Sequence, residues 1–173
     1  MKPTRITLVG PGLAGRRASL SWFLRRTIGE AASPVFDNQD RTAVINRVPC
    51  VISVASLRSQ YGDAAAPGVE EEFERLASSA AFLYVVDSQR ERTEAGLHQL
   101  ERLRSDLASR GIDLDTIPVV FQLNKRDLKN VSPVADLQNA FKTGRCRYIE
   151  SIAPQGRGVV EAFETVLAMV ESP

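Results

Sequence analysis

The chain has 173 residues, of which 43% are hydrophobic and 25% are charged, and its formal net charge is +1. That length suits one domain with its own hydrophobic core, so we expect a single domain over residues 1–173. A net charge near zero gives no overall basic field, which argues against a nucleic-acid partner. The longest apolar run, residues 80–86, is too short to cross a membrane, and no secretory signal pattern is present. We therefore expect a cytoplasmic protein.

Short apolar runs alternate with segments of helical periodicity along the chain. We predict strands at residues 6–9, 43–48, 51–56, 81–86, 117–123 and 147–149, with the second and third forming an antiparallel pair around Pro49. We predict helices at residues 14–27, 69–79, 90–110, 132–142 and 158–170. Alternating strands and helices form a mostly parallel sheet with helices on both faces, so we expect an α/β fold with about six strands. Ligands of such sheets bind at the carboxyl ends of the strands.

The segment after the first predicted strand is a glycine-rich loop, Gly10-Pro-Gly-Leu-Ala-Gly15-Arg16-Arg17. Gly10 and Gly15 have the separation of the phosphate-binding pattern G-x-x-x-x-G-K-[ST], in which backbone N–H groups and a helix N-terminus surround phosphate oxygens. Arginines stand at the lysine and hydroxyl positions. The glycines also fit the dinucleotide pattern G-x-G-x-x-G, but residues 30–40 do not resemble the acidic strand end that this pattern requires. A strand-to-helix turn without a ligand is a further alternative.

A second motif, Asn124-Lys125-Arg126-Asp127, directly follows the predicted strand at residues 117–123. N-K-x-D is the guanine-reading signature of Ras-like GTPases, in which the Asp carboxylate accepts two hydrogen bonds from the base. Such charge-assisted bonds contribute about 1.5–3 kcal/mol each, and adenine would leave the carboxylate unpaired. A third segment, Ile152-Ala153-Pro154, lies where these proteins place a backbone amide near the guanine carbonyl. On its own, an ordinary loop explains that segment better.

With these motifs in this order, the chain resembles the bacterial MglA-type small Ras-like GTPases along essentially its whole length. The resemblance implies a single Ras-like P-loop G domain that binds guanine nucleotide, either GTP or GDP. The stretches that carry it are Gly10 to Gly15, Asp40-Arg41-Thr42, Val86-Asp87-Ser88-Gln89-Arg90-Glu91-Arg92, Asn124 to Leu128, and Ala153-Pro154-Gln155-Gly156.

The resemblance also implies roles for individual residues. Asn124, Lys125 and Asp127 would form the base pocket, with Ala153 beside it. Thr42 would contact Mg²⁺ and the terminal phosphate, and Arg41 would be the arginine that neutralises charge in the transition state. The other nucleotide contacts would come from Gly10, Gly12, Leu13, Ala14, Gly15, Arg16, Arg17 and Gly68. MglA-type proteins pair with roadblock-fold activators, which implies such a partner, and we expect no lipid anchor at the C-terminus.

Three positions depart from the family pattern where phosphate chemistry takes place. Arg16 replaces a compact ammonium with a bulkier, planar cation. Arg17 replaces a hydroxyl that ligates Mg²⁺ with a group that has no lone pair to offer. Val69 follows Pro67-Gly68, where the family has a glutamine that orients the attacking water. Three interpretations of the arginines stay open: a solvent-facing helix start, replacement of Mg²⁺ by guanidinium groups, or a site lost to or filled by the arginines.

These departures predict an atypical G protein. We expect it to bind guanine nucleotide weakly, with little dependence on Mg²⁺, and to hydrolyse GTP slowly or not at all, because phosphoryl transfer depends on positioning and electrostatics. The alternative is a nucleotide-free pseudo-GTPase that acts as a protein-interaction module in polarity or motility regulation. A full-rate GTPase that uses unusual residues is the third hypothesis.

Overall fold

The computed structural model describes residues 3–29, 39–55 and 68–172, and the structural statements below concern these ranges. The strands are β1 (Thr4–Val9), β2 (Arg41–Ile45), β3 (Val48–Val54), β4 (Ala81–Asp87), β5 (Val119–Asn124) and β6 (Cys146–Glu150). They form one six-stranded sheet in the order β2-β3-β1-β4-β5-β6. Every neighbouring pair is parallel except β2 with β3, which confirms the predicted mostly parallel sheet.

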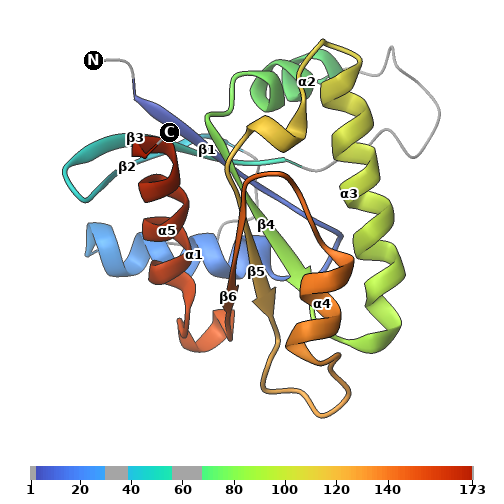
Figure 1. The fold of residues 1–173 in the computed structure, drawn as a ribbon. Coiled ribbons are helices and arrows are strands. Elements are labelled where there is room, and N and C mark those ends of the chain that lie inside the picture. Colours follow the sequence, from blue (N-terminus) through green and yellow to red (C-terminus); the bar gives the residue numbers. More distant parts are fainter. Residues whose placement is uncertain (1–2, 30–38, 56–67, 173) are drawn as a thin grey trace.

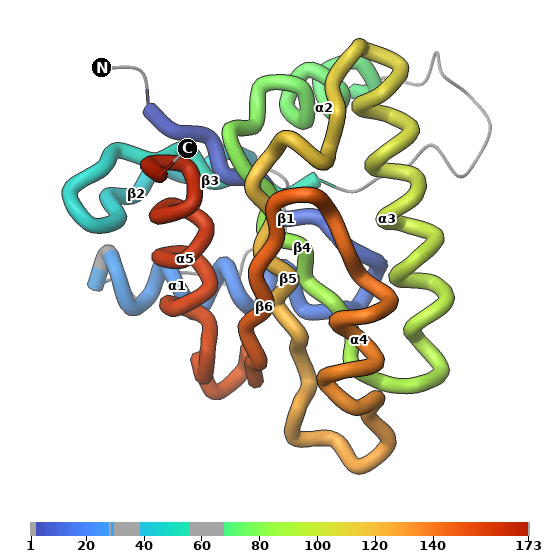
Figure 2. Tube along the Cα trace, in the orientation of Figure 1, coloured from blue at the N-terminus to red at the C-terminus, as the bar shows by residue number. Residues whose placement is uncertain are grey.

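Helices cover both faces of this sheet (Figures 1 and 2). In the described ranges they are α1 (Arg16–Ile28), α2 (Val69–Ala77), α3 (Thr93–Ala108), α4 (Val134–Ala140) and α5 (Val159–Glu171), with short 3₁₀ turns η2 (Arg90–Arg92), η3 (Leu114–Thr116) and η4 (Ala153–Gln155). One hydrophobic cluster joins α1 and α5 to one face of the sheet, and a second joins α2, α3 and α4 to the other. The predicted α/β architecture is therefore confirmed.

The central strands are buried on both sides, as their continuous apolar runs predict. Every residue of β4 and of β5 is buried. On the face under α3 and α4, the rings of Tyr84, Phe121 and Phe141 pack together with centroids 5.5–6.1 Å apart. Both strands end in a polar residue, Asp87 and Asn124, and these two residues lie opposite each other in the register. The buried strands therefore deliver polar side chains to the same edge of the sheet.

The β2–β3 hairpin turns at a different place from the one predicted. Its turn lies at Asn46 and Arg47, whose φ angles are 48° and 71°. Pro49 instead lies within β3, opposite Val44. It precedes the first residue of β3 that pairs with β1, Cys50, so its missing N–H leaves no gap in that parallel ladder.

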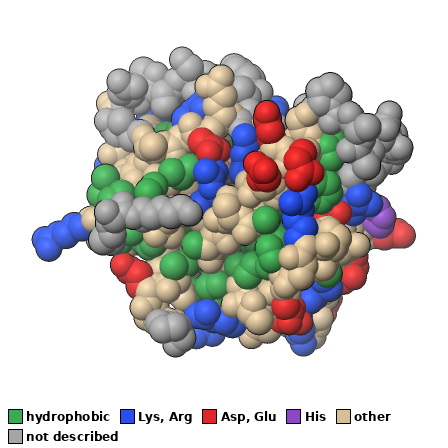
Figure 3. All heavy atoms as spheres, turned by 90° about the horizontal axis from the view of Figure 1, so that it is seen from above, with side chains coloured by type: hydrophobic (Ala, Val, Ile, Leu, Met, Phe, Trp, Pro, Cys, Tyr) green, Lys and Arg blue, Asp and Glu red, His purple; other side chains and the backbone are tan. Residues whose placement is uncertain are grey.

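Other differences concern the ends of elements. The helix predicted at residues 90–110 is divided into η2 and α3, and the helix predicted at residues 132–142 is the shorter α4, which begins at Val134 and ends at Ala140. Seen from above Figure 1, acidic and basic side chains are mixed across the face in view, in keeping with the net charge of +1 (Figure 3). In the part of the chain that the structure describes, no helix is long and apolar enough to cross a membrane.

Candidate nucleotide-binding site

The predicted phosphate loop and the predicted base motif lie at the same edge of the sheet. The loop follows β1, and the N-K-R-D segment begins at the end of β5, with β4 between the two strands. The two segments touch directly, because Asn124 Nδ2 donates a hydrogen bond to the carbonyl oxygen of Ala14 over 2.8 Å. The fold therefore brings together motifs that are 110 residues apart in the chain.

The backbone of the loop requires glycine at both ends. Gly10 has φ 133°, and a Cβ there would lie 2.4 Å from the carbonyl oxygen of Val85 in β4. Gly15 has φ 108°, and a Cβ there would lie 2.3 Å from Asn124 Nδ2. Leu13 also has positive φ, 65°, although its side chain is 86% exposed. A left-handed backbone costs a residue other than glycine about 1–2 kcal/mol, so the loop is held in shape by its surroundings.

Asn124 is the centre of a buried hydrogen-bond network. Its Nδ2 donates to Ala14, and its Oδ1 accepts hydrogen bonds from Ser151 Oγ at 3.1 Å and from the Ala153 N–H at 2.9 Å. Asn124 is only 1% exposed. The side chain thus joins the glycine loop, the end of β5 and the start of η4. A guanine carbonyl would have to share or displace the hydrogen bond that the Ala153 N–H makes here.

Three further polar residues support this network and escaped the sequence analysis. Gln122 Nε2 donates to Ser19 Oγ in α1 and to Ser151 Oγ, both at 2.9 Å. Gln122 Oε1 is buried without a hydrogen-bond partner among the described residues. The available sequence signal was a single glutamine inside the apolar run of residues 117–123.

The two charged residues of the base motif lie in different environments. Lys125, at φ 66°, donates from Nζ to Asp87 Oδ2 at 2.7 Å. The Asp87 side chain is 1% exposed, so the lysine neutralises a buried charge. Asp127 is exposed, and no hydrogen bond or ion pair joins its carboxylate to the rest of the described chain. Its oxygens are therefore free to accept hydrogen bonds from a ligand.

Arg16 and Arg17 are adjacent but differ in exposure. The Arg16 guanidinium donates a hydrogen bond to the carbonyl oxygen of Ala55, just beyond the end of β3. Burial and the positive charge of Arg17 lower the pKa of Arg16, and the negative charge of Glu72 in α2 partly opposes this. Arg17 is exposed. The interpretation of the arginines as a solvent-facing helix start therefore fits Arg17 but does not fit Arg16.

The first-switch residues Arg41 and Thr42 do not lie with the glycine loop in this structure. Thr42 is opposite Val51, which is opposite Arg5 near the start of β1. At about 3.3 Å per residue, the four residues from Arg5 to the end of β1 span roughly 13 Å. The Arg41 guanidinium donates to the carbonyl oxygen of Gln39 at 3.1 Å. The roles of Arg41 and Thr42 stay predictions.

The structure describes only part of the segment assigned to the second switch. Gly68 caps the start of α2 with φ 87°, and Val69 is the first residue of that helix. Pro67, on which the family comparison of this segment also rests, lies outside the described residues. No cluster of three or more acidic, histidine or cysteine side chains able to hold a metal occurs in residues 3–29, 39–55 and 68–172.

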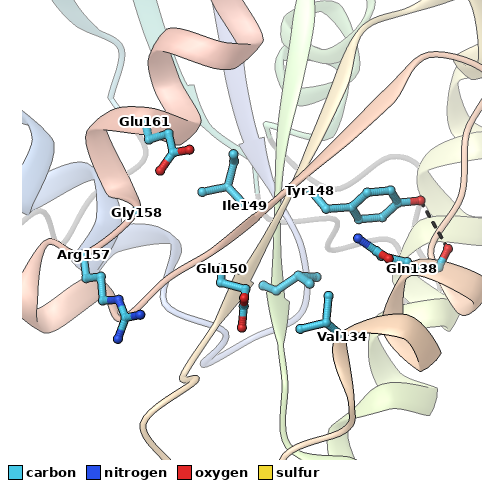
Figure 4. A pocket seen from close by; sticks show the side chains of 9 residues that line it. Val134, Gln138, Tyr148, Ile149, Glu150, Arg157, Gly158 and Glu161 are labelled. Atoms are coloured by element: carbon cyan, nitrogen blue, oxygen red, sulfur yellow. Dashed lines mark hydrogen bonds between the residues drawn. The ribbon is translucent and has the colours of Figure 1, made fainter.

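A hollow of about 350 Å³ lies beside β6 (Figure 4). Tyr148 and Glu150 of β6 border it, with Gln138 of α4 on one side and Glu161 of α5 on the other. The Tyr148 hydroxyl donates to the carbonyl oxygen of Gln138 at 3.2 Å. None of the predicted nucleotide-binding residues lines this hollow.

The sheet order, the glycine loop after β1 and the N-K-R-D segment after β5 define the class of P-loop nucleotide-binding α/β domains. No protein-family model matches the chain. The chain is 31% identical over 174 residues to the mutual gliding-motility protein MglA of Myxococcus xanthus, with 96% of this chain and 89% of that protein covered.

Two fungal proteins show a weaker similarity. Ras-like protein 1 of Saccharomyces cerevisiae is 25% identical over 170 residues, which cover 96% of this chain and 52% of that protein. Ras-like protein 2 of Mucor circinelloides is 23% identical over 165 residues, which cover 94% of this chain and 79% of that protein. The chain belongs to the Ras-like small GTPase family, and MglA is one of its homologues. The resemblance inferred from the sequence is thereby confirmed.

Proposed function

We propose that this protein binds guanine nucleotide weakly and with little dependence on Mg²⁺, and that it hydrolyses GTP slowly or not at all. The observation that carries the proposal is the position of Arg16. Its guanidinium bridges from α1 to the Ala55 carbonyl and lies in the field of Glu72. A fixed cation thus stands beside the glycine loop, where a bound phosphate needs counter-charge. GTP or GDP would be held by this loop and by the base motif.

The base half of the proposal rests on Asn124 and Asp127. Asn124 already ties the loop to η4, and the exposed Asp127 carboxylate has no partner in the described chain. Such a carboxylate would accept two N–H bonds from guanine, whereas adenine has no matching donors. Guanine preference therefore follows from Asp127.

The residues at the phosphate end do not fit a bound Mg²⁺. The family's metal-ligating hydroxyl position holds Arg17, whose guanidinium cannot ligate a cation. Thr42, the other expected ligand, is paired within the β2–β3 hairpin and far from the loop. Mg²⁺ prefers an octahedral set of oxygen ligands, and the described residues do not offer one here. We therefore derive no step through the metal.

The second candidate function is a nucleotide-free protein-interaction module. The same Arg16 contact favours it, because the guanidinium finds a carbonyl acceptor inside the protein without any phosphate. Under this hypothesis the glycine loop keeps its shape as a structural turn. The family resemblance would then point to a protein partner, and a roadblock-fold activator is the first class to test, with the cytoplasm as the expected location.

The deciding experiment is a titration of the purified chain with fluorescent GDP, GTP and ATP analogues, with Mg²⁺ and with a chelator, after removal of any co-purified nucleotide. We expect saturable binding of the guanine analogues alone, with affinities that change little on chelation. Asp127→Ala should abolish the preference for guanine, whereas Lys129→Ala, an exposed neighbour, should preserve it. Absence of binding to every nucleotide would support the interaction module instead. Rapid phosphate release on addition of an activator would contradict the expected slow hydrolysis.

A further inference from the structure

Arg92 connects the start of α3 to the glycine loop. It is the last residue of η2, and its Nη2 donates a hydrogen bond to the carbonyl oxygen of Gly12 at 2.9 Å. The two residues are 80 positions apart in the chain. Arg92 is therefore a tertiary clamp on the loop; it lies in a stretch that carries the family resemblance, but no role in nucleotide binding was inferred for it from the sequence.

A buried carboxylate holds the clamp in place. Asp87 Oδ2 lies 3.8 Å from Arg92 Nε, and the same oxygen accepts the hydrogen bond from Lys125 Nζ at 2.7 Å. Asp87 Oδ1 accepts a hydrogen bond from the backbone N–H of Gln89 at 3.1 Å. The Asp87 side chain is 1% exposed, so these partners supply the compensation that a buried charge needs. One carboxylate thus links the base motif to the residue that clamps the phosphate loop.

The clamp fixes the orientation of one peptide group. The Gly12–Leu13 peptide is planar and trans, so its C=O and N–H point in opposite directions. When Arg92 holds the carbonyl oxygen of Gly12, the N–H of Leu13 must face the other side of the loop. Leu13 has φ 65°, a conformation that a leucine rarely adopts without external support. The Arg92 hydrogen bond provides that support from outside the loop.

We propose that Arg92 is a positioning residue for phosphate recognition, which orients the Leu13 N–H toward a phosphate oxygen and couples the loop to Lys125 through Asp87. The inference rests on the proposed function, because it assumes that the loop receives the phosphates of a guanine nucleotide. Arg92 itself need not touch the ligand. Its effect should appear in binding of the phosphates and not in binding of the base.

The test uses the full chain and compares Arg92→Ala with Arg90→Ala, an exposed arginine in the same turn. Amide hydrogen exchange of residues 12–15 in the nucleotide-free proteins is the first measurement. We expect exchange about tenfold faster in Arg92→Ala than in Arg90→Ala, the scale of one lost charge-assisted hydrogen bond, and partial rescue in Arg92→Lys. Equal exchange in the Arg92→Ala and Arg90→Ala variants would overturn the proposal.

The second measurement separates phosphate from base. Arg92→Ala should weaken GDP binding about tenfold and leave guanosine binding unchanged, because guanosine has no phosphate for the Leu13 N–H. An equal loss for both ligands would overturn a role in phosphate recognition. If the wild-type chain binds no nucleotide but Arg92→Ala still loosens residues 12–15, the proposed function fails while the clamp is supported.

Discussion

Arg16 and Arg17 occupy consecutive positions in α1, yet the fold gives them different surroundings. Successive side chains of an α-helix point about 100° apart, which follows from 3.6 residues per turn. Arg16 therefore reaches the Ala55 carbonyl while Arg17 is exposed. The two departures from the family pattern have separate consequences. Under the proposed function, Arg16 in place of the lysine keeps a fixed cation beside the loop, whereas Arg17 in place of the hydroxyl offers no oxygen ligand to Mg²⁺.

Restoring both family residues should restore the dependence on metal. In the double variant Arg16→Lys, Arg17→Ser, the hydroxyl offers a lone pair to Mg²⁺ and the lysine offers a compact ammonium to phosphate. We expect GTP affinity to rise about tenfold or more with Mg²⁺ and to fall again with a chelator, on the scale of one charge-assisted contact. Arg25→Lys with Arg26→Ser, at the exposed end of the same helix, is the matched control. Binding that stays independent of the metal in both double variants would contradict this interpretation.

Gly15 is a loop position at which the structure leaves no room for a side chain. Gly15→Ala would place a Cβ 2.3 Å from Asn124 Nδ2 and would force alanine to adopt φ 108°. We expect the free energy of unfolding to fall by about 1–3 kcal/mol, measured by urea denaturation, with loss of nucleotide binding. Gly12→Ala is the control, since a Cβ at Gly12 meets nothing within 4 Å among the described atoms. Similar stabilities for the two variants would show that the Asn124 contact does not constrain the loop.

At the scale of elements, a charged cluster ties the start of β2 to its neighbours. Asp40 accepts hydrogen bonds from Arg5 of β1 at 2.7 Å and from Ser53 of β3 at 2.8 Å. Arg75 of α2 lies 3.4 Å from the same carboxylate. Burial alone would raise the pKa of Asp40, but the Arg5 and Ser53 hydrogen bonds and the two positive charges hold that pKa below its usual value. The cluster therefore joins the element that carries Arg41 to the helix that carries Val69.

This cluster should give the protein a component of stability that disappears in acid. The pKa of Asp40 is lower in the folded than in the unfolded chain, so its contribution is complete above the unfolded value, about 3.9, and is lost as pH falls through the folded value. We expect Asp40→Asn to reduce stability at pH 6 by up to about 1 kcal/mol, since the carboxylate is partly exposed.

The measurement is urea unfolding of wild type and Asp40→Asn at several pH values between pH 6 and pH 3. The difference between them should shrink below about pH 4, where the carboxylate becomes protonated in the unfolded chain, and should vanish only below the lower pKa of the folded protein. Asp136→Asn, an exposed aspartate in the first turn of α4, is the control. A difference that does not depend on pH would show that the Asp40 charge does not stabilise this junction.

A helix or strand can be predicted from the sequence where its local residue pattern matches its position in the tertiary structure. The apolar run ending at Asp87 became a fully buried central strand, and the N-K-R-D motif lies at the strand end where it was expected. The prediction of the hairpin turn at Pro49 was wrong, because the sequence alone does not distinguish a proline near the start of a strand from a proline in a turn. The left-handed turn at Asn46 and Arg47 has no comparably strong local signal.

Contacts between residues that are far apart in the chain could not be predicted from the sequence. Gln122 meets Ser19 from 103 residues away, and Arg92 meets Gly12 from 80 residues away. Each partner is an ordinary polar residue in its own segment. Their pairing depends on the strand order and register, which the sequence fixes only through packing of the whole sheet. For the same reason, the placement of Thr42 opposite Val51 was not foreseen.

At the scale of the whole molecule, the edge that carries the site has two parts. One part joins the glycine loop, the end of β5 and η4 through the buried Asn124 network, with the Asp87 cluster beside it. The other part is α2, whose Glu72 acts electrostatically on Arg16 of α1 and whose Arg75 lies 3.4 Å from the Asp40 carboxylate at the start of β2. Under the proposed function, a nucleotide held by the first part would also interact with Arg16, which is linked to the second part. Binding should therefore stabilise both parts of the native fold together.

Thermal unfolding with and without ligand tests this consequence. A ligand that binds only the native state at about 100 times its dissociation constant stabilises it by about 2.7 kcal/mol. For a domain of this size, that corresponds to a rise in Tm of roughly 5–10 °C. We expect this rise with GDP in the presence of a chelator as well as with Mg²⁺, and not with ATP. Asp127→Ala should lose the response to GDP while keeping the Tm of the ligand-free protein, since its exposed carboxylate has no partner in the described chain. An unchanged Tm at millimolar GDP would favour the interaction module, because a native-state ligand at saturating concentration must raise the stability of the fold that binds it.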